Sequence, residues 1–232
     1  MPVLARIPYA RVELRWHEDL SGAAESRAKQ MRGALAQAFA DDDLFHQHDA
    51  EGKPLYRYPY VQYRWQGGQG VVVGWWEAAN RLLQLPWLDL PLRLGNDEVC
   101  VTDATLTANY GSFELSERLH HYQIISPMLL FNQQNYRRYQ GMNEVEQQAE
   151  RDRLLVAQLL IAMRGLQVEF PVNLYATFTH VRGRVAHYKQ QDLIGITGRF
   201  VCNAALPPDL AIGHAVSHGY GWIIPAPPQE IR

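Results

Sequence analysis

The sequence predicts an α+β fold in two lobes. Its 232 residues suit one large domain or two small ones of roughly 100 residues each. Strand-forming and helix-forming patterns alternate along both halves, and turn-forming residues separate them. Apolar residues make up 47% of the chain, which is enough material for a buried core. We place the boundary between the lobes near residue 95, which gives domains at 1–95 and 96–232.

The first half follows the order βαββαβ, which is the ferredoxin-like order. A strand rich in β-formers is expected at 3–13, and Ser21 is placed to cap a helix at 22–40. Gly67 and Gly68 then make a tight turn between two strands of a hairpin. The remaining expected elements of this half are the two hairpin strands, a short amphipathic helix and a short strand, at 57–65, 70–74, 76–85 and 90–94.

The second half is again mixed, with strands around two helical stretches. Pro127 is expected to start a helical stretch that runs to 135, and 143–164 has the pattern of a long helix. Arg182 and Gly183 are expected to form the turn of a hairpin. The strands of this half are expected at 98–109, 119–125, 172–181, 183–189 and 193–203.

Two histidines, His46 and His48, lie two residues apart after the first helix. In an extended segment, residues two apart point to the same side. Two imidazoles on one side suit a general base and a general acid, because the unperturbed pKa of histidine is about 6.5. A zinc site needs three or four ligands, and no further ligand at suitable spacing lies nearby. The alternative is a pair of exposed loop histidines with no role.

A predicted strand rich in aromatic and basic side chains follows the histidines. Its tyrosines at 56, 58 and 60 share one face, and Arg57 lies on the other face, with Arg64 further along. Aromatic rings stack on bases and arginines pair with phosphates, so such a sheet is a known RNA platform. The alternative is that Tyr56, Tyr58 and their neighbours are core residues, which half-buried tyrosines in sheets often are.

A glycine-containing segment, GHAVSHGYG at 213–221, comes near the end of the chain. Gly219 and Gly221 would free the backbone for close approach to a phosphate, and Ser217 and His218 add polar side chains. The alternative is an ordinary turn before a last strand.

Composition and net charge limit the classes of protein to which this chain could belong. A formal net charge of −2 counts against a protein that binds nucleic acid by bulk positive charge, although a local basic face is compatible with it. No apolar run reaches the roughly 18 residues of a membrane span, and no signal peptide is evident, so we expect a cytoplasmic protein away from the membrane. Cys100 and Cys202 are expected to be small buried residues.

Four segments, in this order, resemble one family. They are Met31-Arg-Gly-Ala34, LFHQHD followed by YRYPYVQY, YQIISPMLLFNQQNYRRY at 122–139, and GHAVSHGYGWI near the end. Together they resemble the CRISPR-repeat-processing endoribonucleases, the Cas-six family of the RAMP superfamily, and specifically its b-type branch. The resemblance runs over nearly the whole chain, and LFHxHD with YRYPxxQY is its most specific part.

The resemblance implies two tandem ferredoxin-like (RRM-like) domains and a single cut in CRISPR repeat RNA, with no metal and no cofactor. It places His46 and His48 at the family's histidine positions, and Tyr56 or Tyr58 near an assisting tyrosine. Arg32 is the nearest match to a basic residue of the first helix, and the glycine segment falls where the family contacts RNA. Subunits of a CRISPR effector complex and a second copy of the chain are further candidate partners.

Two other classes of protein stay open at this point. One is a non-catalytic RNA-binding subunit that holds a processed guide, although such a protein needs no acid–base pair. The other is a zinc hydrolase, which a metal analysis of the purified protein would detect.

Overall fold

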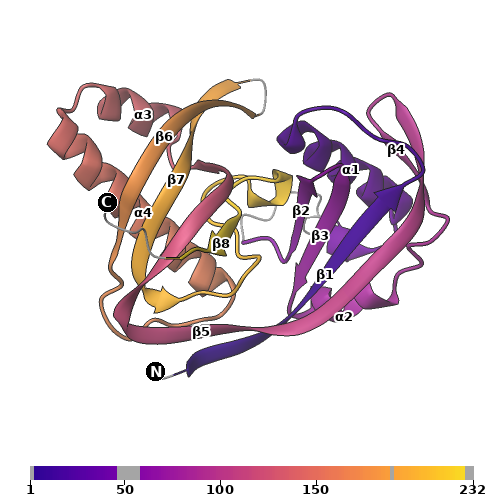
Figure 1. Ribbon diagram of the computed structural model, residues 1–232, viewed down its shortest axis with the longest axis horizontal. Coiled ribbons are helices and arrows are strands. Elements are labelled where there is room, and N and C mark those ends of the chain that lie inside the picture. The colour runs from indigo at the N-terminus through magenta and orange to yellow at the C-terminus, as the bar shows by residue number, and fades with distance from the viewer. Residues whose placement is uncertain (1–2, 46–57, 189–190, 228–232) are drawn as a thin grey trace. The chain divides into compact units, whose positions relative to one another are not determined.

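A computed structural model describes residues 3–45, 58–188 and 191–227 (Figure 1). The chain divides into two compact units. The N-terminal unit holds Ile7–Tyr110 and Val216–Gly219, and the C-terminal unit holds Met1–Arg6, Gly111–Ala215 and Tyr220–Arg232. The sequence-based boundary near residue 95 falls in a hairpin turn, and the two units meet further along, between Tyr110 and Gly111. Four residues from near the end of the chain therefore belong to the N-terminal unit.

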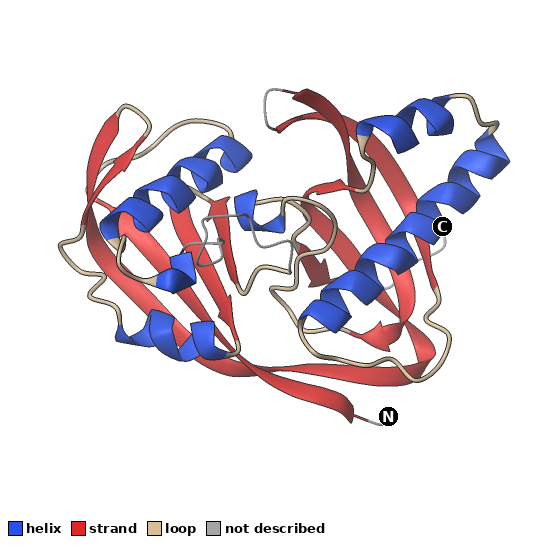
Figure 2. Cartoon of the chain, turned by 180° about the vertical axis from the view of Figure 1, so that it is seen from behind, coloured by secondary structure: helices blue, strands red, loops and turns tan. Residues whose placement is uncertain are grey.

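The N-terminal unit is a sheet with strand order β2-β3-β1-β5, covered on one face by two helices (Figure 2). Its elements are β1 (Val3–Trp16), α1 (Ala24–Ala38), η1 (Asp43–Phe45), β2 (Val61–Gln66), β3 (Gln69–Trp75), α2 (Glu77–Gln84), β4 (Pro91–Leu94), the first part of β5 (Asp97–Leu129) and the short 3₁₀ helix η2 (Val216–His218). β2 and β3 form the expected hairpin, with Gln66 opposite Gln69. The βαββαβ order is thus present. The strand beside β1 is β5, however, and β4 pairs with β5.

The core of the N-terminal unit lies between the helices and the sheet. Met31 of α1 and Leu82 of α2 are fully buried among Val12 and Val72 of the sheet. Each large apolar side chain that is buried contributes roughly 1.5–3 kcal/mol. The inner face of α1 therefore fixes the helix, and with it the position of Arg32, which is half-buried.

The start of α1 differs from the expectation. The helix begins at Ala24, and its N-cap residue is Ala23, which makes no side-chain cap. Ser21 therefore does not cap the helix. Its carbonyl oxygen instead accepts a hydrogen bond of 2.7 Å from Nε of Arg27. The Arg27 side chain reaches back past the start of the helix to this backbone carbonyl, and the predicted cap by the Ser21 hydroxyl is absent.

The C-terminal unit is a second sheet, with strand order β5-β7-β6 and β8 paired to β5. Its elements beyond β5 are α3 (Gln133–Gln140), α4 (Glu144–Gly165), β6 (Ala176–Tyr188), β7 (Gln191–Ala205) and β8 (Ile223–Pro225). α4 lies across one face of this sheet (Figure 2). It starts with a capping box, in which the Asn143 side chain accepts from the Glu146 N–H and the Glu146 carboxylate accepts from the Asn143 N–H.

Two expectations for this unit are wrong. Pro127 does not start a helix, because β5 continues through it to Leu129. Its pairing with β7 shifts register between Ile124 and Met128, and a proline, which lacks an N–H, is tolerated at such an irregularity. Arg182 and Gly183 do not form a turn either. They lie within β6, where Gly183 pairs with Ile196 of β7.

Candidate functional site

The histidine segment lies mostly outside the described residues. His46, His48, Tyr56 and Arg57 all fall in 46–57, so their places stay predictions. The described residues on either side of the segment are buried in the N-terminal unit. Phe45, directly before His46, is 3% exposed and its ring stacks on Phe39 at 5.1 Å between centroids. Tyr58, on the far side, is 9% exposed.

A cluster in the N-terminal unit brings together three of the predicted RNA-binding residues. Nη1 of Arg32, on α1, lies 3.2 Å from Nε2 of His218, which ends η2. Oγ of Ser217 lies 3.2 Å from Nδ1 of the same imidazole. Arg32 and His218 are 186 residues apart in the chain. The fold thus joins the first helix to the glycine segment, although no local sequence pattern connects the two.

Gly219 explains how η2 comes so close to α1. Its φ is +87°, a left-handed conformation that side chains rarely adopt. A Cβ at this position would lie 2.7 Å from the Cβ of Ala28 and 3.4 Å from the carbonyl oxygen of Tyr63. η2 therefore packs directly on α1 and β2. The glycine is buried, and its role in the structure is close packing rather than open access for a phosphate.

Arg32 has no carboxylate partner among the described residues. Its neighbour on the same helix, Arg27, is different. Nη1 of Arg27 forms an ion pair of 2.6 Å with Asp97 and also donates to the carbonyl oxygen of Leu94, so the charge of Arg27 is compensated. Of the two arginines, Arg32 is the one whose charge has no carboxylate partner among the described residues. Arginine's planar fork suits a phosphate.

The charge of Arg32 also affects a buried tyrosine of the core. Tyr63 of β2 is buried, and burial raises the pKa of its phenol well above the usual value, while the nearby positive charge of Arg32 lowers it in part. The raised pKa keeps the Tyr63 phenol neutral across the physiological range. Tyr63 is therefore a neutral residue of the core near Arg32.

Three other predicted residues have packing roles in the structure, which corrects the expectations for them. Arg64 is 2% exposed and donates to Oε1 of Gln62 at 3.2 Å, so it has no surface to offer to RNA. Tyr58 is buried as well. Gly221, with φ +73°, lies against the backbone of Ile212, where an added Cβ would come 1.9 Å from the carbonyl oxygen. β-strand alternation alone could not show that both faces of β2 are buried.

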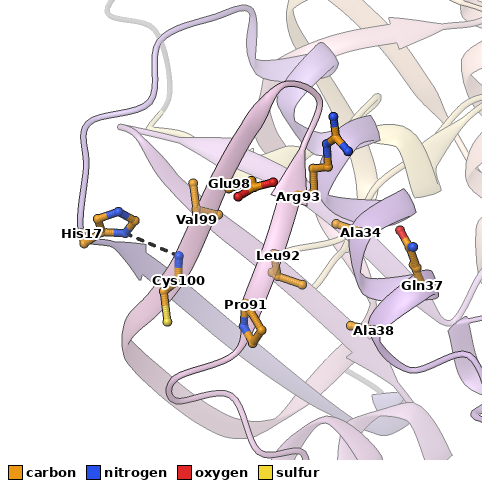
Figure 3. Close-up of a pocket in the computed structure, with 10 residues that line it drawn as sticks. All are labelled: His17, Ala34, Gln37, Ala38, Pro91, Leu92, Arg93, Glu98, Val99 and Cys100. Carbon is orange, nitrogen blue, oxygen red and sulfur yellow. Dashed lines mark hydrogen bonds between the residues drawn. The ribbon is translucent and has the colours of Figure 1, made fainter.

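A groove on the N-terminal unit was not expected from the sequence. It has a volume of about 520 Å³ and lies between α1 and the β4–β5 hairpin (Figure 3). Arg93 and Glu98 line one part of it, and His17 accepts a hydrogen bond from the Cys100 N–H at 3.4 Å in another. None of the predicted site residues that the structure describes lines it. Cys100 is also only half-buried, whereas Cys202 is buried as expected.

Two further features are absent from the described residues. No three His, Cys, Asp or Glu side chains in 3–45, 58–188 and 191–227 come together as metal ligands would. No helix in these ranges is both long and apolar enough to cross a membrane.

Comparison with known proteins places this geometry in a class. The chain superposes on a crystal structure of Cas6b with a TM-score of 0.83 at 21% identity, covering 96% of this chain and 100% of that one. A crystal structure of the CRISPR RNA processing endoribonuclease Cas6b gives a TM-score of 0.72 at 18% identity, with the same coverage. The fold is therefore that of the Cas6 and RAMP proteins, with tandem ferredoxin-like domains.

Sequence models then identify the family. The model of the Cas6b N-terminal domain matches residues 5–111, and that of the Cas6b C-terminal domain matches 114–226. The chain belongs to the Cas6b family. The two matched regions meet close to the division between the compact units at Tyr110 and Gly111. An uncharacterized protein of Methanocaldococcus jannaschii is 28% identical over 133 residues, which are 57% of this chain and 90% of that protein.

Proposed function

We propose that this chain is a metal-independent endoribonuclease that cuts CRISPR precursor RNA within the repeat. The observation that carries the proposal is the match to both Cas6b domains across residues 5–226, in a chain that also holds the pair His46 and His48. The structural relative named as a CRISPR RNA processing endoribonuclease adds support through its shared fold. Subunits of an effector complex and a second copy of the chain stay candidate partners.

The reaction follows from the chemistry of RNA. The ribose 2′-oxygen forms a bond to the adjacent phosphorus, and the bond from phosphorus to the 5′-oxygen of the next nucleotide breaks. The products are a 2′,3′-cyclic phosphate and a 5′-hydroxyl. Because the nucleophile belongs to the substrate, the protein has to supply a base for the 2′-OH proton, an acid for the leaving 5′-oxygen and donors for the charge on phosphate.

We assign the proton transfers to His46 and His48, without fixing which is the base and which the acid. Tyr56 assists in the same segment. Arg57 and Arg32 supply donors to the phosphate. Of these residues the structure describes Arg32, whose unused donors and uncompensated charge fit this role.

The test of the proposed function is a gel with labelled repeat RNA from the CRISPR array next to the gene. We expect the RNA to be both bound and cut. RNA that is shifted but never cut would favour a non-catalytic RNA-binding subunit and would overturn the proposal.

Arg32 provides a sharper test of RNA binding. Replacing Arg32 with methionine should weaken repeat binding about tenfold, because a charge-assisted hydrogen bond is lost. It should also reduce the slope of log K against log salt concentration by about 0.7, the contribution of one phosphate contact on a single strand. Both quantities come from a binding titration at several salt concentrations.

Lys29 is the matched control for this variant. It lies on the same helix, is exposed and carries the same charge, so Lys29→Met changes the net charge equally. We expect Lys29→Met to change affinity by less than about twofold. Equal losses in both variants would mean that the helix acts by general charge alone, and that Arg32 is not a specific contact.

A further inference from the structure

We propose that His218 is a positioning residue, which holds the guanidinium of Arg32 toward the RNA phosphate through a hydrogen-bond chain from Ser217 to His218 to Arg32. This inference rests on the proposed function. It replaces the expectation that Ser217 and His218 contact RNA themselves.

The chemistry of the three groups fixes the direction of the chain. An arginine side chain has donors and no acceptor, so Nε2 of His218 must accept from Nη1 of Arg32. A neutral imidazole that accepts at Nε2 carries its proton on Nδ1. The Nδ1–H then donates to Oγ of Ser217. The contact to Arg32 therefore selects one tautomer of His218, and Ser217 stabilises the same one.

Ser217, where the hydrogen-bond chain starts, is held in place by its burial. Ser217 is 6% exposed and Val216 is 4% exposed, so η2 is buried on the side of the serine. Gly219 directly after it packs against Ala28. The imidazole thus has a fixed place relative to α1. A flexible arginine that is already held loses less conformational freedom when it binds its ligand.

A neutral acceptor suits this purpose better than a carboxylate would. The pair of Arg27 and Asp97 shows the alternative in the same unit, where a carboxylate compensates the positive charge. His218 orients Arg32 without adding a negative charge next to it. The full charge of the guanidinium and its other donors stay available for a phosphate.

The test is a double-mutant cycle on binding of the cognate repeat RNA. We expect Arg32→Met to weaken binding about tenfold and His218→Met about threefold, the latter from the lost preorganisation of one side chain. The double variant should bind no more weakly than Arg32→Met alone, because His218 acts through Arg32. Losses that multiply in the double variant would overturn the proposal and would indicate that His218 contacts RNA itself.

A conservative variant separates positioning from packing. Glutamine and methionine have similar length and volume, but glutamine offers an oxygen near the place of Nε2. His218→Gln should therefore restore affinity to within about twofold of the wild type, whereas His218→Met should not. Equal losses in the two variants, with unchanged thermal unfolding, would contradict the role. Because the readout is binding, the cycle can be measured even if the wild-type protein does not cut, and a failed cycle leaves the cleavage result untouched.

Discussion

Replacing both His46 and His48 with alanine is expected to abolish cleavage of the cognate repeat while its binding stays within about twofold. Each histidine is proposed to transfer a proton in the reaction, and a positioned acid or base contributes typically 10²–10⁴-fold. Loss of both should slow the single-turnover rate by roughly 10⁴-fold or more. The rate is measured with end-labelled repeat RNA in excess protein, in buffer containing EDTA.

His17→Ala is the control for this double variant. His17 lies in the N-terminal unit, its side chain is 44% exposed, and it lines the groove beside Cys100 (Figure 3). This substitution should leave the rate unchanged. If the double variant cuts at the wild-type rate, the assignment of acid and base to these histidines is wrong.

Single variants would separate the two roles. A base acts in its neutral form, so it gives the limb of the pH–rate profile that rises with pH. An acid acts in its protonated form and gives the limb that falls. The single variant that loses the rising limb identifies the base.

Gly221→Ala is expected to destabilise the protein by about 3 kcal/mol or more, which places it in the upper tail of single substitutions. Its φ of +73° disfavours any side chain, and the added Cβ would lie 1.9 Å from the carbonyl oxygen of Ile212. The Gly221 carbonyl also accepts from the Ile212 N–H at 2.9 Å, so a local shift would break this bond. For a chain of this size the midpoint of thermal unfolding should fall by on the order of 10 °C.

Gly183→Ala is the matched comparison. Gly183 lies in β6 of the same unit, is exposed, and has open space where a Cβ would be added. This substitution should change stability by less than about 0.5 kcal/mol, or raise it slightly. A Gly221→Ala variant that unfolds like the wild type but no longer binds RNA would show that Gly221 contacts the ligand, as the sequence first indicated.

Elements whose signals are local were predictable from the sequence. The long helix expected at 143–164 is α4, which has its capping box at Asn143. The turn at Gly67-Gly68 joins β2 to β3 as expected. In both cases a few neighbouring residues determine the backbone, so a pattern within a short window is enough.

Elements that depend on distant partners were harder to predict. Pro127 and the Arg182-Gly183 pair have the composition of a helix start and a turn, yet both lie in strands. Pairing with β7 decides their conformation. Met128, next to Pro127, pairs with Ile196 far along the chain, and Gly183 pairs with the same residue across the β6–β7 hairpin. Tertiary pairing outweighs local preference at these positions.

In the candidate site, too, short motifs were predictable and contacts between distant residues were not. The histidine pair and the glycine segment stand out as short motifs, and their meaning came from a family resemblance. The contact between Arg32 and His218 joins residues 186 apart, and no local pattern indicates it. The glycines of the second motif were interpreted as ligand contacts, because a sequence does not show which neighbour a missing Cβ makes room for. The structure shows Ala28 beside Gly219 and Ile212 beside Gly221.

The most direct test of the proposed chemistry is to map the ends of the RNA that the purified protein produces from its repeat in the presence of EDTA. We predict one cut, with a 2′,3′-cyclic phosphate on the upstream product and a 5′-hydroxyl on the downstream one. A 2′-deoxy substitution at the nucleotide before the cut should block it, because the nucleophile is removed. Cleavage that requires an added divalent metal, or that leaves a 5′-phosphate, would contradict the mechanism.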